Sequence, residues 1–503
     1  MSRPATLIPL GAEYIPPAKD ILALQRAAFL RDGIPDLAAR IDRVQRLQAM
    51  ILDNSEELVA ALAEDFGTRP REVSLLADVV GAMGDLEYQK KHLRSWMRKE
   101  PQGWLRARAG LRQYIRRDPL GVVGVIGPWN FPVQLTVLPA GTALAAGNRV
   151  MVRPSEVTAC TADVLAGLSR RYFAIEELAV ITEAQCSGAD FADLPLDHLF
   201  FTGSPAVGAQ VAQAAGRHLV PVTLELGGKN PVVVDDSADI AQAARRIAAS
   251  RMVNGGQVCM CPDYVFVPES VLNDFVNELM NAWADTLPQI LTNPQYTSVI
   301  NERHFDRINE LIDDAVSRGA TIRQHLPSGE ALPDRRTRKI APTVLTDVSP
   351  GSSIETDEIF GPVLVVYPYT ALREAIDHIN NGPHPLTIYW YGDDNDRFEI
   401  LQSATRSGSV NGNDFTVNFL GSELPFGGVG NSGTGAYRGR AGFTTFTHAR
   451  AVAFSRLPVS IANSMSPPFG RRDRGLMVLQ LSTFRRRNRA PARAPLSRRC
   501  PAD

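Results

Sequence analysis

The sequence predicts an α/β protein with a parallel sheet in its first α/β domain, followed by a second α/β domain. The chain has 503 residues, which is too long for one simple core. Short apolar runs alternate with helical patterns from Leu120 to Leu224, and a second such series starts at Pro231. Strands that alternate with helices in this way favour parallel sheets covered on both faces.

The composition argues against several functional classes. Hydrophobic residues make up 44% of the chain and the net charge is −1, so no global field recruits nucleic acid or a membrane surface. No apolar run approaches the roughly 20 residues of a membrane span, and residues 1–11 lack the pattern of a signal peptide. The five cysteines and eight histidines show no metal-ligand spacing. We therefore expect a reduced, cytoplasmic, metal-free protein without a nucleic-acid or membrane partner.

Periodicity assigns the elements in order. Residues 17–99 repeat apolar side chains at helical spacing, and residues 112–117 alternate like a polar strand. The first series has strands at 121–126, 149–152, 179–182, 198–201 and 220–224, and helices at 133–146, 158–172 and 205–215. The second series has strands at 231–235, 264–267, 363–367 and 386–391, and helices at 238–252, 271–287, 303–318 and 372–380.

The last hundred residues follow neither series. Residues 412–442 are rich in glycine and predict a long loop, and the phenylalanines within it favour an ordered loop under a cleft. From Arg471 onward the chain is strongly basic, which is typical of a solvated, flexible tail.

Cys259 lies between a predicted helix and a predicted strand, in the segment Asn254–Asp263. Gly255 and Gly256 leave little backbone bulk beside it, so a ligand could reach its thiol. The alternative interpretation is a small buried residue, because free cysteines are commonly buried.

Two loops at strand ends carry groups that could assist a nucleophile. Asn130 lies in the loop Gly127–Pro132, and its amide could donate to an oxyanion; the alternative is a turn residue packed between aromatic rings. Glu225 ends an apolar strand, where a raised pKa would suit a general base; the alternative is a salt bridge to Lys229.

Two further loops fit a nucleotide. Ser155 fits a helix N-cap, and Arg153 and Glu156 beside it could hold ribose hydroxyls, where a carboxylate favours a free 2′-hydroxyl over a 2′-phosphate. The glycine turn Gly203–Gly208 leads into a helix whose N-terminus could bind phosphate.

Seven segments of this chain match one family in order and in spacing. They are PWNFP at 128–132, RPSE at 153–156, FTGSPAVG at 201–208, LELGGK at 224–229, NGGQVC at 254–259, EIFGPV at 358–363 and LPFGGVGNSGTGAY at 424–437. The sequence resembles the aldehyde dehydrogenase superfamily over residues 15–455. The segment CPDYVFVP at 261–268 and the TFTHAR ending look most like its class 3 and coniferyl aldehyde dehydrogenase branch.

The resemblance implies a role for each matching residue. Cys259 would be the nucleophile, Glu225 the base that activates water, and Asn130 an oxyanion donor. The implied cofactor residues are Trp129, Arg153, Ser155, Glu156, Gly203, Ser204, Gly208, Leu226, Gly227, Glu358 and Phe360. The family usually has Lys at the position of Arg153, which leaves NADP open, although Glu156 favours NAD.

The resemblance also implies an organisation. A Rossmann-like cofactor domain would span residues 1–224, a catalytic domain 225–411, an active-site loop and arm 412–455, and a basic tail 456–503. Strands near Tyr114 (residues 111–118) and at 451–454 would form an oligomerisation hairpin, which supports a homodimer, or a tetramer in other branches.

The implied substrate is an aromatic aldehyde such as coniferyl aldehyde, oxidised to ferulate through a thioester. Medium-chain aliphatic or benzaldehyde-type substrates are the alternative, and a catalytically idle scaffold is a second one. Glu225 argues against a CoA-acylating enzyme, which needs no hydrolytic base. Candidates for the tunnel lining are Tyr88, Trp96, Phe415 and Phe419, and Cys261 is a candidate redox partner of Cys259.

Overall fold

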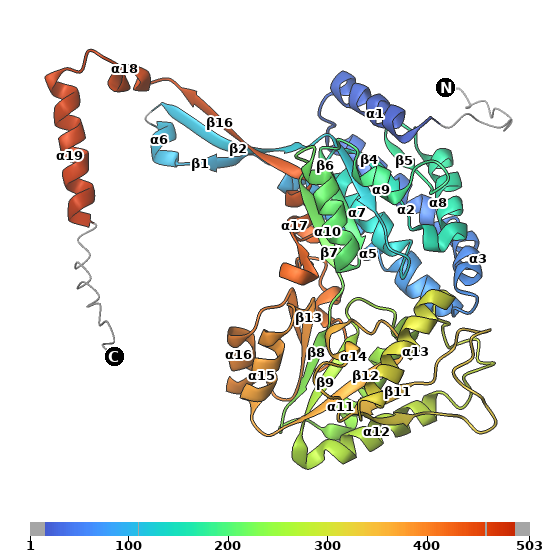
Figure 1. Cartoon of the computed structure of the whole chain (residues 1–503). Helices are drawn as coiled ribbons and strands as arrows, with labels where there is room; N and C mark the ends of the chain where they lie inside the picture. Colours follow the sequence, from blue (N-terminus) through green and yellow to red (C-terminus); the bar gives the residue numbers. More distant parts are fainter. Residues whose placement is uncertain (1–15, 109, 458–459, 488–503) are drawn as a thin grey trace, which may run out of the picture. The chain divides into compact units, whose positions relative to one another are not determined.

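A computed structural model of the chain describes residues 16–108, 110–457 and 460–487 (Figure 1). The chain divides into two compact units. The first consists of Met1–Arg98 and Arg116–Arg450, and the second of Lys99–Ile115 and Ala451–Asp503. All candidate site residues belong to the first unit, which has the predicted α/β architecture.

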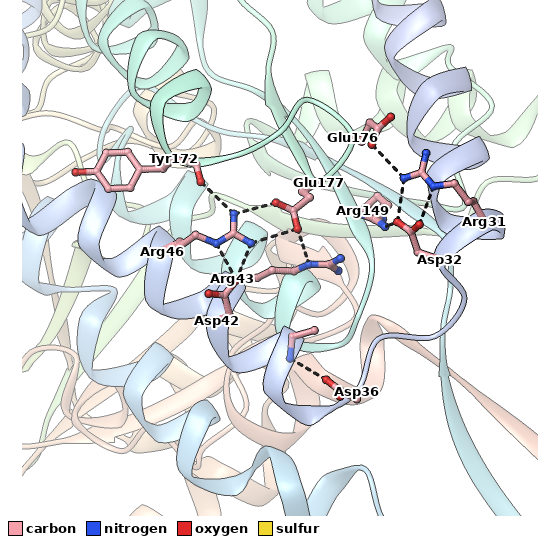
Figure 2. A network of polar contacts seen from close by, with 11 residues as sticks. Arg31, Asp32, Asp36, Asp42, Arg43, Arg46, Arg149, Tyr172, Glu176 and Glu177 are labelled. Atoms are coloured by element: carbon pink, nitrogen blue, oxygen red, sulfur yellow. Dashed lines mark hydrogen bonds and ion pairs between the residues drawn. The ribbon is translucent and has the colours of Figure 1, made fainter. Parts of the chain in front are cut away.

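The N-terminal part of the first unit is helical, as predicted. Its helices are α1 (Ala18–Asp32), α2 (Leu37–Leu52), α3 (Ser55–Phe66), α4 (Arg71–Val73) and α5 (Met83–Trp96), with a π-helical turn η1 (Ser74–Val80) between α4 and α5. Glu177, which precedes strand β5 (Leu178–Val180), accepts hydrogen bonds from Arg43 and Arg46 of α2 (Figure 2). These ion pairs fix α2 against the edge of the neighbouring sheet.

A six-stranded sheet follows, in the order β15-β7-β6-β3-β4-β5. Its strands are β3 (Val122–Ile126), β4 (Arg149–Arg153), β5 (Leu178–Val180), β6 (His198–Gly203), β7 (Val222–Leu226) and the antiparallel β15 (Gly433–Thr434). The connecting helices are α7 (Gln134–Ala145), α8 (Ala159–Tyr172), α9 (Gly188–Ala192) and α10 (Pro205–Gly216). The chain leaves β3 for β4 on one side and returns to β6 on the other, which makes the β3–β6 boundary a topological switch point.

The seven-stranded sheet has the order β10-β11-β12-β9-β8-β13-β14. Its strands are β8 (Asn230–Val234), β9 (Pro262–Pro268), β10 (Thr321–Gln324), β11 (Thr343–Thr346), β12 (Val363–Tyr369), β13 (Thr387–Tyr391) and β14 (Ser409–Gly412). Its helices are α11 (Ile240–Met252), α12 (Leu272–Thr286), α13 (Glu302–Ser317), α14 (Ser353–Thr356), α15 (Leu372–Asn381) and α16 (Asp396–Ala404). Strands β10, β11 and β14 and helices α14 and α16 are additions to the prediction.

These additions lie where sequence patterns are weakest. Each of the three strands has four residues, and β10 and β14 are the two edges of the sheet. Because edge strands are short and β10 is largely exposed, they lack the apolar run that reveals a central strand. Strand β7 continues to Leu226, so the predicted boundary after residue 224 lies inside a strand.

The glycine-rich segment is an ordered loop, as its phenylalanines indicate. It contains the 3-10 turns η5 (Val417–Leu420) and η6 (Gly430–Ser432), strand β15 and helix α17 (Gly439–Thr445). Phe426 packs edge-on against Tyr437, and Tyr437 packs against Phe200 of β6. The loop is therefore fixed to the six-stranded sheet by aromatic contacts.

The second unit holds β1 (Glu100–Gln102) and α6 (Trp104–Arg108), with most of β2 (Leu111–Pro119) and β16 (Thr447–Ser455). The three strands form a sheet in the order β1-β2-β16, so the strands near Tyr114 and Ala451 are neighbours. Helices α18 (Ile461–Met465) and α19 (Arg471–Arg487) follow. The structure corrects the expected tail from Arg471 to a helix up to Arg487, and the arginines and Cys500 beyond it lie outside the described residues.

Within the described ranges, no helix has both the length and the apolar composition that a membrane span requires. The same ranges contain no cluster of three or more His, Cys, Asp or Glu side chains suited to a metal ion.

Candidate active site

A cavity of about 1490 Å³ lies at the carboxyl ends of the parallel strands of the six-stranded sheet. The loops that follow β3, β4, β6 and β7 line it, together with Cys259 and part of the glycine-rich loop. Ligands of α/β sheets bind at this end, beside the switch point between β3 and β6. The cavity brings together the three predicted catalytic residues, Cys259, Glu225 and Asn130.

A tight backbone turn presents Cys259 to this cavity. Asn254, Gly255 and Gly256 have φ angles of 51°, 64° and 77°, which carry the chain out of α11 through the left-handed region. A Cβ on Gly256 would lie 2.2 Å from the carbonyl oxygen of Gly361, so only glycine fits at this position. The sequence predicts these glycines as room for a ligand, whereas the structure shows that Gly256 permits a close approach to the backbone of Gly361.

Side-chain amides hold both flanks of the thiol segment. Asn230 donates through Nδ2 to the carbonyl oxygens of Cys259, at 2.7 Å, and of Cys261, at 3.0 Å. Gln257 donates to the carbonyl of Ser298 and accepts from the amide of Ile300. The backbone that carries Cys259 is therefore fixed before any ligand binds.

The Cys259 thiol is half-buried among acidic groups. Burial raises its pKa well above the ordinary value, and the nearby carboxylates of Glu358 and Glu225 raise it further. In this state the sulfur is protonated at neutral pH. The surrounding side chains therefore oppose the thiolate form of Cys259.

Glu225 lies on β7 and is only 4% exposed. Neither carboxylate oxygen has a hydrogen-bond partner among the described residues, and burial raises its pKa well above the ordinary value. The alternative pairing with Lys229 is wrong, because Lys229 forms a salt bridge with Asp263. Glu225 is thus a buried carboxyl group in a cavity, with no structural partner in the described chain.

Asn130 follows β3 and connects its loop to the turn before Cys259. Its Nδ2 donates to the carbonyl of Gln257 at 3.2 Å, and Asn254 donates back to the carbonyl of Asn130 at 3.1 Å. The Asn130 loop and the thiol turn therefore form one hydrogen-bonded unit.

A buried ion pair supports the Asn130 loop from behind. Asp78 of η1 accepts the backbone N–H groups of Val133 and Gln134, at 3.0 and 3.2 Å, and pairs with Arg69 at 2.6 Å. Both charged side chains are fully buried, and the Arg69 guanidinium lies over the rings of Phe66 and Phe131. These contacts fix the first turn of α7 and the residues before it.

The predicted cofactor residues lie in the same cavity, with one exception. Its lining includes Trp129, Arg153, Ser155, Glu156, Gly203, Ser204, Leu226, Gly227, Glu358 and Phe360. Gly208 does not line the cavity. A Cβ at that position would lie 2.6 Å from Leu226 Cδ2. Gly208 instead allows α10 to pack closely on β7.

Two serines form helix caps beside the cavity. Ser155 accepts a hydrogen bond from the backbone of Val157, as the N-cap interpretation predicts. Ser204 caps α10 by accepting from Val207, and Pro205 follows at the first helical position. The N-terminus of this 12-residue helix faces the cavity, where its dipole favours an anion.

Glu358 lies over Gly227, where a Cβ would be 2.2 Å from its Oε2. Burial and the charge of Asp263 raise the pKa of Glu358 to about 8. Arg307 of α13 donates to the carbonyls of Glu358 and Ile359, at 2.9 and 2.6 Å. This arginine, which the sequence pattern did not reveal, anchors the acidic segment at the cavity.

Trp129 packs between two rings, Phe360 at 5.2 Å and His304 at 5.0 Å. Burial and two neighbouring arginines lower the pKa of His304 to about 4, so the imidazole is neutral at pH 7. His304 lines the cavity, but none of the seven matching segments includes it, so no motif in the sequence marks it.

An aromatic wall bounds the cavity on the side of the glycine-rich loop. It consists of Phe415, Phe419, Phe426 and Tyr437. Of the four predicted tunnel residues, Phe415 and Phe419 line the cavity. Tyr88 and Trp96 do not line it, and both pack against His92 within α5. Cys261 is a free thiol, as is Cys259; its Sγ lies 3.3 Å from the carbonyl of Ser250, in the core.

The chain matches the model of the aldehyde dehydrogenase family over residues 25–452. It is 42% identical to a coniferyl aldehyde dehydrogenase of a Pseudomonas species over 94% of this chain and 98% of that protein. It is 38% identical to a rat enzyme named "Aldehyde dehydrogenase, dimeric NADP-preferring", over 87% of this chain and 94% of the relative.

Among solved structures, the chain is similar to one described as the substrate-bound state of Staphylococcus aureus AldH. The TM-score is 0.84 and the sequence identity 31%, over 93% of this chain and 100% of that one.

Proposed function

The chain belongs to the aldehyde dehydrogenase family, and we propose that it oxidises an aromatic aldehyde, such as coniferyl aldehyde, to the carboxylic acid with NAD. The observation that carries this proposal is the meeting of Cys259 and an unpartnered, buried Glu225 in one cavity with a helix N-terminus. Such a cavity offers a nucleophile, a base and a place for a dinucleotide.

The residues present fit a dinucleotide. The N-terminus of α10 and Ser204 would hold the pyrophosphate, Glu156 the adenosine ribose, and Glu358 the second ribose. Gly227 leaves room beside the Glu358 carboxylate that any side chain would fill. When bound, the oxidised nicotinamide supplies a hydride acceptor and a positive charge that favours the Cys259 thiolate.

Cys259 is the nucleophile of the proposed reaction. Its thiol releases a proton to solvent, and the sulfur forms a bond to the aldehyde carbon while the carbonyl oxygen becomes an alkoxide. The Asn130 amide and the backbone N–H of Cys259 stabilise that negative charge. Loss of the hydride then leaves a thioester on Cys259.

Glu225 completes the cycle as a general base. It takes a proton from water, and the resulting hydroxide attacks the thioester carbon. The carbon–sulfur bond breaks, the carboxylic acid leaves and the thiolate returns. Because no described side chain holds the Glu225 oxygens, the carboxylate is free to orient a water molecule. This favours hydrolysis over transfer to CoA.

The aromatic wall and the relatives support an aromatic substrate. Phe415, Phe419, Phe426 and Tyr437 offer planar apolar surfaces to a ring. NADH formation from coniferyl aldehyde, benzaldehyde and hexanal, without CoA, tests the proposal. We expect the highest kcat/KM for coniferyl aldehyde. Equal or higher values for hexanal would contradict the substrate, and absence of NADH with all three would contradict the activity.

We also propose a homodimer that assembles through the β1-β2-β16 sheet, since a relative is named as dimeric. Its mass in solution, by light scattering, tests this.

The reaction needs Cys259 as a thiol, which is the state of a reducing compartment such as the cytoplasm.

A further inference from the structure

Arg153 is a buried cation whose donors are already engaged within the chain. Its side chain is 1% exposed at the end of β4. Nε donates to the carbonyl of Cys186 at 2.9 Å, Nη1 donates to the carbonyl of Pro154, and Nη2 pairs with Glu183. Nη2 also lies 3.6 Å from the carboxylate of Glu156. Each nitrogen of the guanidinium thus has an acceptor.

The carboxylates that hold Arg153 remain accessible. The side chains of Glu183 and Glu156 are 52% and 59% exposed, and both residues line the cavity. Glu183 lies in a turn that Thr182 and Gln185 close by hydrogen bonds. Arg153 holds the next residue of this turn, Cys186, by its carbonyl. Both the backbone and the side chain of the turn are therefore anchored to Arg153.

The cluster lies within reach of a ribose whose phosphate is held at the N-terminus of α10. In the sheet, β4 is two strands from β6, because Ile126 of β3 pairs with both Arg153 and Phe201. Two strand spacings are about 10 Å. A ribose attached to a phosphate at the N-terminus of α10, which follows β6, would reach the end of β4.

The cluster carries a net negative charge. One guanidinium faces two carboxylates, and Arg217, another cation on the cavity lining, pairs with Asp193 at 3.1 Å. A ribose 2′-hydroxyl can donate to a carboxylate, whereas a 2′-phosphate is repelled by it and needs a free arginine. The Arg153 guanidinium could bind such a phosphate, but it is already paired with the Glu183 carboxylate.

We propose that Glu183, together with Glu156, selects NAD over NADP by engaging Arg153 and presenting a second carboxylate to the adenosine ribose. This inference rests on the proposed dehydrogenase function. It assigns a specificity role to Glu183, which no motif in the sequence marks, and it explains how an arginine at position 153 is compatible with NAD.

Equilibrium binding of NADH and NADPH, followed by nicotinamide fluorescence, tests the inference without turnover. We expect the unmodified protein to bind NADH more tightly. Glu183→Gln should tighten NADPH binding by roughly tenfold, the effect of one opposing charge near a protein surface, and change NADH binding by less than about threefold. Adenosine 2′,5′-bisphosphate and adenosine 5′-phosphate, as competitors of NADH, should show the same change at the adenosine end.

Glu183→Gln could tighten NADPH binding in two ways, by freeing Arg153 to bind the 2′-phosphate or by removing a repelling carboxylate. A double variant distinguishes these two causes. Glu183→Gln combined with Arg153→Met should lose most of the gain in NADPH affinity. Glu176→Gln removes a carboxylate from an ion pair with Arg31, outside the cavity, and should leave both affinities unchanged.

Three results would overturn the inference: tighter NADPH binding by the unmodified protein, an unchanged affinity ratio in Glu183→Gln, or an equal loss of both affinities in that variant. Binding of neither dinucleotide would instead contradict the proposed function.

Discussion

Lys229 forms a buried salt bridge with Asp263, and this pairing leaves Glu225 free. Both charged side chains of the pair are less than a tenth exposed, and the Lys229 ammonium also donates to the carbonyl of Ile354 at 2.8 Å. Asp263 accepts the backbone N–H of Ile359 at 2.9 Å. The pair thus serves to anchor the segment that carries Glu358, although Lys229 is only four residues from Glu225.

Glu225→Gln should separate the two halves of the reaction. Thioester formation needs Cys259 but no base for water, so a burst of NADH equivalent to the enzyme should remain. The steady rate after the burst should fall about 10²–10⁴-fold. Stopped-flow absorbance measures both phases. Loss of the burst together with the steady rate would contradict the assignment of Glu225 to hydrolysis. Cys259→Ser is the control, for which we expect neither a burst nor turnover.

The acidic surroundings of Cys259 predict slow alkylation at neutral pH. Because burial, Glu358 and Glu225 raise the thiol pKa, the thiolate is scarce at pH 7 and increases about tenfold per pH unit up to that pKa. The iodoacetamide reaction at Cys259 should accelerate from pH 7 to pH 9.5. Glu358→Gln should accelerate it at pH 9, where Glu358, with a pKa of about 8, is ionised. Cys259→Ser corrects for labelling of Cys160 and Cys186. A plateau below pH 8 would show that the thiol pKa is low.

Asp78→Asn should reduce turnover through the position of Asn130, which Asp78 does not contact. Loss of the charge weakens the hold on Val133 and Gln134 and leaves Arg69 unpaired in the interior. Since an oxyanion donor contributes a factor of about 10²–10³, we expect kcat to fall by up to that factor.

A double-mutant cycle with Asn130→Ala distinguishes positioning from general destabilisation. If Asp78 acts through Asn130, the second substitution should cost less kcat in the Asp78→Asn background than in the unmodified protein. Additive losses would contradict the positioning role. Thermal unfolding of each variant shows that the comparison is between folded proteins.

Sequence patterns located the cavity because its residues lie in short loops at strand ends. Asn130 and Glu225 follow or end strands of the six-stranded sheet, so the topology of a parallel sheet brings them to one edge. Cys259 instead comes from the glycine turn between α11 and β9, and its motif rather than a strand end marked it. Buried charge pairs gave no such signal. Arg153 and Glu183 are 30 residues apart, and a sequence does not show which of many charges meet in three dimensions.

The sequence was a poor guide where a residue close in the chain offered an obvious partner or an obvious role. Lys229 is next to Glu225 in the chain but pairs with Asp263. Gly208 belongs to a phosphate-binding pattern but serves the packing of α10 against Leu226. Tyr88 and Trp96 are aromatic, yet both pack against His92 within α5, because helix geometry brings residues four positions apart together.

The salt bridge between Arg438 and Asp85 connects the stability of the protein to its choice of substrate, so breaking it should change both. They form a two-pronged salt bridge at 2.9 and 3.0 Å, with both side chains 2% exposed. The same guanidinium donates to the carbonyl of Phe419 at 2.9 Å and lies 4.0 Å from the centre of its ring. Because Phe419 belongs to the aromatic wall, the ion pair supports that wall from behind.

Asp85→Asn leaves the Arg438 charge without a carboxylate and should lower the free energy of unfolding by about 3–5 kcal/mol. The wall should also lose its fixed position, so kcat/KM for coniferyl aldehyde should fall more than that for propanal. Urea unfolding and the two kcat/KM values measure these effects. Asp32→Asn, which breaks the Arg149 salt bridge outside the cavity, is the matched control and should leave the ratio unchanged. A parallel fall for both aldehydes would assign Arg438 to stability alone.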